Sequence, residues 1–131
     1  MIFDTNLIIE HIRKEQSLPN TVVIPVVVVG ELRAFALKAD WGSQKIAFLE
    51  NLFKRYPVVE ITVYLTENYA LIDAYSQGKL QFQPLPTGLT ARNMGKNDLW
   101  IAATALYLDM ELHTKDNDFD HLINIGLKLV K

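Results

Sequence analysis

The sequence predicts an α/β domain, a three-layer sandwich in which helices flank a mostly parallel sheet. Short runs of β-branched and aliphatic residues alternate with longer segments whose apolar residues recur at helical spacing. Strands and helices that alternate in this way favour parallel strand pairing. The chain has 131 residues, of which 50% are hydrophobic and 21% charged, and we expect a single domain over residues 1–131.

The composition excludes several classes of protein. The absence of cysteine rules out disulfides, thiolate zinc sites and cysteine nucleophiles. No stretch is long and apolar enough to span a bilayer, so we expect a cytoplasmic protein with no membrane association. No phosphate-binding glycine motif is present.

The first two elements are a strand and a helix joined by polar residues. MIFD, residues 1–4, forms a short buried strand. Asp4, Thr5 and Asn6 are all residue types that cap helices, and apolar residues follow them at helical spacing. We therefore expect a helix over residues 6–14.

The next segment, TVVIPVVVV, is ambiguous because its propensity also suits one long strand. Pro25, however, breaks a strand ladder and is well placed in the first turn of a helix. We expect a strand over residues 21–24 and a helix over residues 26–39.

The middle of the chain contains two further helices. An apolar stripe predicts a helix over residues 42–55, and PVVEI, residues 57–61, predicts a strand. Apolar and aromatic residues recur at i, i+4, i+7 and i+10 over residues 65–78, which predicts another helix. The segment 81–95 contains two prolines and two glycines and is expected to be a long irregular connection.

The last part of the chain alternates again between helix and strand. We expect Asn97 to cap a helix over residues 97–108, and ELHT, residues 111–114, to form a strand. A short helix over residues 119–123 and a strand over residues 127–130 complete the expected fold.

Four acidic residues stand near the ends of these elements. Asp4 ends the first strand, Asp98 lies in the first turn of its helix, and Asp116 follows the strand ELHT. Glu31 lies inside an apolar helix. In a parallel α/β sandwich these side chains can meet at one edge of the sheet, where such folds place their sites.

Each acid also has a structural explanation. Asp4 and Asp98 could be helix caps, because acids near a helix N-terminus gain roughly 0.3–1 kcal/mol. Glu31 could be half-exposed, paired with Arg33 or Lys38, or a ligand. By the same reasoning, Asp118 and Asp120 are expected to cap the short final helix and face solvent.

The four acids together indicate a metal site. Crowded carboxylates repel one another unless a cation is present, and oxygen-only ligands suit Mg²⁺ or Mn²⁺. The net charge of −2 argues against nucleic-acid binding, but removing these four from the 15 acidic residues leaves 11 against 13 basic ones. The chemistry implied is attack of water on a phosphodiester, assisted by metal.

Four fragments in this order, MIFDTNLII, GEL, KNDLWIAATAL and ELHTKDNDF, resemble the PIN-domain family, and most closely its VapC-type toxin endoribonucleases. The resemblance covers nearly the whole chain. It implies a Rossmann-like sheet and a Mg²⁺- or Mn²⁺-dependent ribonuclease that leaves a 5′-phosphate and a 3′-hydroxyl. It also implies a homodimer that a cognate antitoxin silences and that cuts transfer or ribosomal RNA.

The resemblance also assigns roles to residues. The catalytic and metal-binding acids of the family correspond to Asp4, Glu31, Asp98 and Asp116. Asp98, Asp116 and Asp4 would hold the principal cation, and Glu31 would complete the cluster or bind a second one. Further matching positions are Asp118, an additional acid in some members, and Thr5, Asn6 and Thr114, which orient the acids or the attacking water.

Two departures from the family pattern concern Glu31. Family members commonly open the second helix with Ser or Thr, where this chain has Val27 and Val28. The lost cap would leave Glu31 less firmly placed, and Arg33 and Lys38 could compete with metal for it.

The basic residues near the acids allow two interpretations. Arg92, Lys96 and Lys115 either bind the RNA backbone or are simply solvated. Two other functions compete with the nuclease as explanations of this sequence. A haloacid-dehalogenase-type phosphatase needs an acid two residues after Asp4, where this chain has Asn6. A catalytically weakened PIN-like module that binds RNA or protein is the other alternative.

Overall fold

A computed structural model describes residues 1–131 and contains five short parallel strands. β1, β4 and β5 form one group and β2 and β3 a second. A parallel bridge between Ile2 and Val23 joins the two groups, which gives the order β3-β2-β1-β4-β5. The strands are β1 (Ile2–Phe3), β2 (Ile24–Pro25), β3 (Val58–Val59), β4 (Glu111–His113) and β5 (Lys128–Val130).

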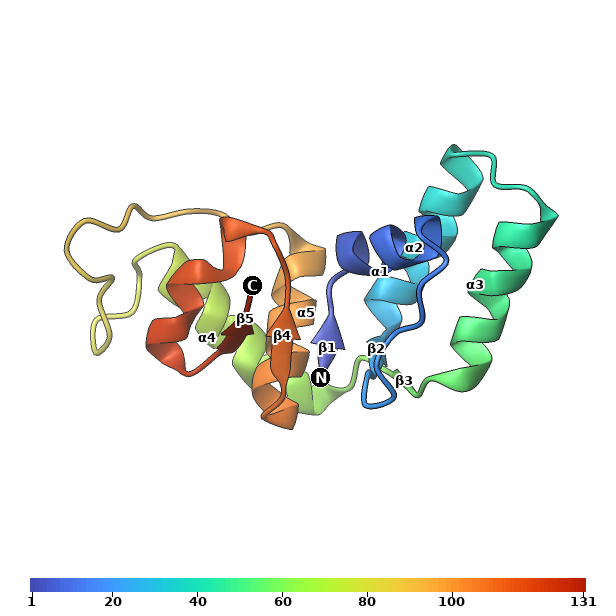
Figure 1. Cartoon of the computed structure of the whole chain (residues 1–131). Helices are drawn as coiled ribbons and strands as arrows, with labels where there is room; N and C mark the ends of the chain where they lie inside the picture. The colour runs from blue at the N-terminus through green and yellow to red at the C-terminus, as the bar shows by residue number, and fades with distance from the viewer.

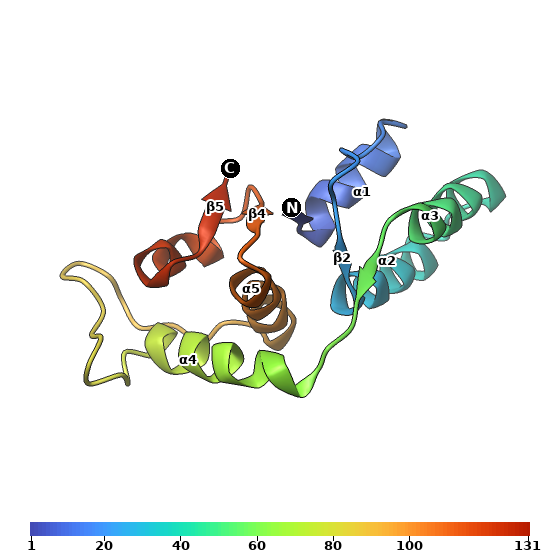
Figure 2. The same ribbon diagram turned by 90° about the horizontal axis from the view of Figure 1, so that it is seen from below.

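Helices cover both faces of this sheet. In Figure 1, α2 and α3 form a helical hairpin at one side, and α4, α5 and η2 gather at the other. Figure 2 shows α1 on one side of the strands and α4 and α5 on the opposite side. The helices are α1 (Thr5–Arg13), α2 (Val26–Lys38), α3 (Ser43–Arg55), α4 (Thr66–Ser76) and α5 (Lys96–Leu108), with 3₁₀ segments η1 (Val63–Leu65) and η2 (Asn117–Ile125). None of the helices is long and apolar enough to cross a membrane.

The central strands and α5 carry much of the core. Ile2 of β1 pairs in register with Leu112 of β4, and both are completely buried. The small side chains Ala102, Ala103 and Ala105 are buried on α5, so this helix packs closely beneath the sheet. This packing fixes the N-terminus of α5 near the carboxyl ends of β1 and β4.

The predicted fold class is confirmed, and the elements differ from expectation mainly at their ends. Pro25 closes β2 opposite Val59 and is also the N-cap of α2, so the ambiguous segment divides at the proline. The prediction that Asn97 caps α5 is wrong. Gly95 occupies the N-cap with no side-chain hydrogen bond, because the helix begins one residue earlier, at Lys96.

Candidate active site

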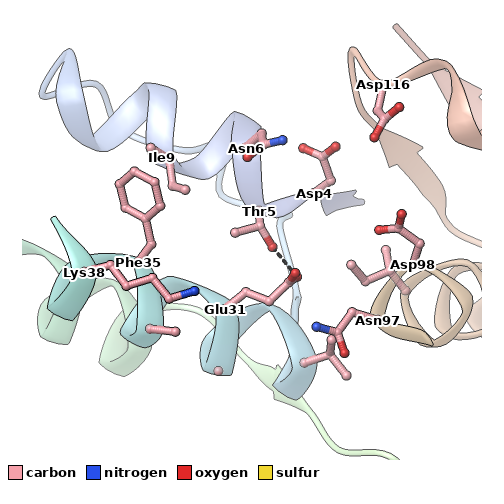
Figure 3. A pocket seen from close by; sticks show the side chains of 14 residues that line it. Asp4, Thr5, Asn6, Ile9, Glu31, Phe35, Lys38, Asn97, Asp98 and Asp116 are labelled. Carbon is pink, nitrogen blue, oxygen red and sulfur yellow. Dashed lines mark hydrogen bonds between the residues drawn. The ribbon is translucent and has the colours of Figure 1, made fainter. Parts of the chain in front are cut away.

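A cavity of about 600 Å³ opens where β1 and β4 end, between α1, α2 and α5 (Figure 3). All four acids singled out in the sequence line it. We call it the acidic cavity. Its lining consists of Asp4, Thr5, Asn6, Ile9, Val27, Gly30, Glu31, Ala34, Phe35, Lys38, Asn97, Asp98, Ile101 and Asp116.

Asp4 is a helix cap that also faces the acidic cavity. Asp4 is only 6% exposed, and the Leu7 amide donates to its Oδ1 at 3.0 Å. The hydroxyl of buried Thr114 donates to its other oxygen, Oδ2. These two bonds hold the carboxylate in one orientation, so capping and site formation are compatible roles for Asp4.

Thr114 also positions Asp116. The Asp116 amide donates to Thr114 Oγ1 at 3.0 Å, and Asp116 Oδ1 in turn accepts from the Asp118 amide at 2.9 Å. Asp116 is therefore the N-cap of η2. The expectation that Asp118 and Asp120 cap this helix is wrong because η2 begins earlier, at Asn117, and Asp120 pairs with Lys131 at 2.6 Å.

Glu31 reaches the acidic cavity from α2 and is held from α1. Thr5 Oγ1 donates to Glu31 Oε1 at 2.7 Å (Figure 3). The expected competition from Arg33 is absent, because Arg33 turns away to pair with Glu50 at 2.5 Å.

The start of α2 lacks a side-chain cap, as Val27 and Val28 led us to expect. Val28 is instead completely buried and Val27 lines the acidic cavity, so both serve packing. The hydroxyl of Thr5 provides the restraint on Glu31 that the helix opening does not.

Asp98 lies in the first turn of α5 and is half-buried. Burial, followed by the negative charges of Asp116 and Glu31, raises the pKa of Asp98 to about 6. The weaker contributions of Asp118 and Asp4 act in the same direction. All of the neighbouring charges that raise this pKa are carboxylates, so negative charge accumulates in the cavity.

The most closely spaced carboxylates are those of Asp98, Asp116 and Asp118, whose oxygens lie within 4.8 Å of one another. Asp4 and Glu31 line the cavity outside this group, because their oxygens are turned toward Thr114 and Thr5. A set of closely spaced carboxylate oxygens fits a hard divalent cation such as Mg²⁺ or Mn²⁺.

The basic residues expected to contact RNA lie around this cluster. Arg92 borders a neighbouring cavity of about 340 Å³ that also includes Asp98 and Asp118. Lys96 is exposed at the first position of α5. Lys115 is exposed and pairs with Glu10 at 3.0 Å, so part of its charge is already balanced.

One wall of the acidic cavity was not predicted from the sequence. Phe35 and Lys38 line it from α2, and Ile9 lines it from α1. The spacing to Glu31 contained the signal, since Phe35 and Lys38 lie four and seven residues beyond it and share its face of the helix.

A PIN-domain family profile matches residues 1–124. The chain belongs to the PIN-domain family. No curated protein matches it in sequence.

Solved structures of VapBC proteins share the fold over nearly the full chain. VapBC2 of Rickettsia felis, bound to a DNA fragment from its promoter, superposes with a TM-score of 0.74 at 23% identity, covering 99% of this chain and 98% of the other. VapBC-1 of nontypeable Haemophilus influenzae superposes with a TM-score of 0.66 at 26% identity, covering 100% of this chain and 98% of the other. VapBC-5 of Mycobacterium tuberculosis superposes with a TM-score of 0.64 at 24% identity, covering 98% of this chain and 94% of the other.

Proposed function

We propose that this PIN-domain chain is a Mg²⁺- or Mn²⁺-dependent endoribonuclease and the toxin of a VapBC-type toxin–antitoxin pair. The observation that carries the proposal is the acidic cavity, where four separate segments contribute carboxylates and the pKa of Asp98 rises to about 6. Repulsion of this kind is relieved by a bound divalent cation.

In this proposal Asp98 and Asp116 hold the principal cation together with Asp4, and the nearby Asp118 is an additional ligand. Glu31 completes the cluster or binds a second cation. When bound, such a cation lowers the pKa of a coordinated water and neutralises charge on the scissile phosphate.

The chain's own residues orient these ligands and the substrate. Thr114 aligns Asp4 and Asp116, and Thr5 aligns Glu31. Asn6, exposed at the cavity, is placed to contact substrate or water.

Arg92, Lys96 and Lys115 would bind phosphates of RNA on either side of the cleaved bond. The proposed substrate class is transfer or ribosomal RNA, and we expect the activity in the cytoplasm. Cleavage leaves a 5′-phosphate and a 3′-hydroxyl.

Two protein partners belong to the proposal. The Mycobacterium relative is described as a member of the VapBC family of toxin–antitoxin systems, which supports a cognate antitoxin for this chain. We also expect a homodimer. Exposed apolar side chains at η1 and α5 suit its interface, namely Val63, Tyr64 and Tyr107, of which the two tyrosine rings stack at 6.4 Å.

The test is cleavage of structured RNA by the purified chain in Mn²⁺. We expect cutting that EDTA abolishes and that Asp98→Asn reduces at least a hundredfold, with 5′-phosphate ends on the products. Cutting that survives both changes would indicate a contaminant or another mechanism. Failure to cut any RNA, with RNA binding retained, would favour the binding module.

A further inference from the structure

The acidic cavity has a second end that the acids do not reach. At this end it is walled by Ile9 and Phe35 and bordered by Lys38 (Figure 3). A neighbouring hollow of about 290 Å³ shares Asn6, Ile9 and Phe35 with it and adds Glu10, Arg13 and Lys14, of which Glu10 and Lys14 pair with each other at 2.8 Å. We call this hollow the outer hollow. Together the two form a depression that runs from the carboxylates along the cleft between α1 and α2.

The acidic cavity is larger than a cation and one phosphate require. Cavities of about 300–1,000 Å³ typically enclose a whole small ligand. With the cation and the scissile phosphate at Asp98 and Asp116, the end beside Phe35 has room for the adjoining nucleotide.

Lys38 is the only basic side chain that lines the acidic cavity, and it makes no salt bridge within 4 Å. Figure 3 shows its side chain lying along α2 with the amino group directed toward Glu31. An ammonium group that faces an acidic cavity without a partner is suited to a phosphate oxygen of a bound strand.

Phe35 provides an aromatic surface beside this charge. Its ring is half-buried and packs edge-on against Trp41, with ring centroids 5.7 Å apart. The guanidinium carbon of Arg13 lies 5.2 Å from the centre of the Phe35 ring. Aromatic rings and guanidinium planes are the surfaces on which proteins stack unpaired nucleobases.

We propose that Phe35, Arg13 and Lys38 form a subsite for the nucleotide next to the scissile phosphodiester bond. This proposal rests on the proposed nuclease function. The base stacks on Phe35 and Arg13, and Lys38 binds the accompanying phosphate. A base must leave its helix to present its face in this way. The subsite therefore selects a substrate that is single-stranded at this position, such as a loop.

The test uses the chain with Asp98→Asn, so that RNA is bound without being cut. Binding is measured by fluorescence anisotropy for a labelled eight-nucleotide RNA and for eight otherwise identical RNAs, each with one abasic position. We expect one abasic position to weaken binding about tenfold. Adding Phe35→Leu should remove this difference, and Phe35→Tyr should retain it.

Matched controls separate this role from a structural one. Phe53 has the same kind of partner, with the Arg33 guanidinium 4.9 Å from its ring, but lies on α3 outside the acidic cavity. Phe53→Leu should keep the abasic profile. Lys38→Gln should reduce the slope of log Kd against log salt concentration by about 0.7. Lys54→Gln, on the exposed side of α3, should leave this slope unchanged.

The outcomes distinguish this proposal from the nuclease assignment. An abasic profile that is flat, or that Phe35→Leu leaves unchanged, overturns the subsite even if the wild-type chain cuts RNA, and leaves the outer hollow for an apolar side chain of a protein partner. A position-dependent profile that needs Phe35, without cutting in Mn²⁺, keeps Phe35 as a base-binding site and rejects the nuclease.

Discussion

At the scale of single residues, Asp98 shows which electrostatic effect dominates the cavity. Its position in the first turn of α5 should favour the ionised form by roughly 0.3–1 kcal/mol. The pKa nevertheless rises from 3.8 to about 6. Burial and neighbouring carboxylates therefore outweigh the helix dipole, and Asp98 is ionised near neutral pH at a cost to folding.

This cost predicts how pH affects stability without metal. Because the pKa of Asp98 is higher in the folded chain, its contribution to the free energy of unfolding falls as pH rises from about 4 to about 6. After discounting for partial exposure, Asp98→Asn should stabilise the chain by about 1–2 kcal/mol at pH 8 in EDTA. At pH 4 the two proteins should unfold at nearly the same temperature.

The measurement is thermal unfolding of both proteins at pH 4 and pH 8. The control is Asp40→Asn, on an exposed turn outside the acidic cavity. It should leave the unfolding temperature unchanged at both pH values. An equal stabilisation by Asp98→Asn at both pH values would show that repulsion in the cavity is not its cause.

At the scale of secondary-structure elements, threonine hydroxyls connect the segments that supply the acids. Thr5 of α1 bonds to Glu31 of α2, and Thr114, directly after β4, bonds to Asp4 at the end of β1. Neither hydroxyl faces bulk solvent freely, since Thr5 is half-buried and Thr114 fully buried. These bonds orient carboxylates that would otherwise repel one another.

Thr5→Val tests the connection between α1 and α2. Valine keeps the shape of threonine and loses the hydroxyl, so Glu31 loses its partner, which is worth about 1 kcal/mol. We expect the cleavage rate to fall about fivefold to tenfold and the unfolding temperature to fall by no more than about 3 °C. Thr5→Ser should restore most of the rate.

The matched control is Thr66→Val; the Thr66 hydroxyl, exposed at the first residue of α4, donates to the Val63 carbonyl at 2.7 Å. It should leave the cleavage rate unchanged. A loss of rate in Thr5→Ser equal to that in Thr5→Val would mean that the hydroxyl is not what matters.

Local chemistry predicted most elements of this fold from sequence. Pro25 separated β2 from α2 correctly, because a missing amide and a fixed φ suit only a strand end or a helix start. The strands proved shorter than their β-branched runs, because pairing depends on a neighbouring strand as well as on propensity. The cap of α5 was misassigned to Asn97 for a similar reason: several polar residues in a row allow more than one helix start.

The candidate site was only partly predictable. The sequence indicated which acids gather, because strand and helix ends meet at one edge of a parallel sheet. It did not indicate that Arg33 would turn to Glu50 or that Thr5 would bond to Glu31. Such contacts depend on how α1, α2 and α3 pack, which periodicity within one helix does not determine.

At the scale of the whole molecule, the acidic cavity spans two halves of the chain. Glu31 belongs to the half with β2 and α2, and Asp4, Asp98 and Asp116 belong to the half with β1, β4 and α5. A cation shared between the halves would stabilise the folded chain in proportion to its concentration.

We therefore expect Mn²⁺ to raise the unfolding temperature of the wild-type chain. At a hundredfold excess over Kd the gain is about 2.7 kcal/mol, or on the order of 8 °C for a chain of this size. Asp116→Asn should lose most of this shift, and Asp73→Asn, on α4 outside the cavity, should keep it. Equal shifts in all three proteins would place the bound ion elsewhere.

The single bridge between Ile2 and Val23 has a dynamic consequence. It is the only β-bridge between the two groups of strands; beside it the Val23 amide donates to the Met1 carbonyl at 2.9 Å and the Met1 amino group donates to the Thr21 carbonyl at 3.0 Å. This amide hydrogen is protected only while the seam between the groups stays closed. The deuterium-exchange rate of this amide therefore measures how often the two groups of strands separate. A cation that binds carboxylates from both groups should lower this exchange rate, although the amide does not contact the cation.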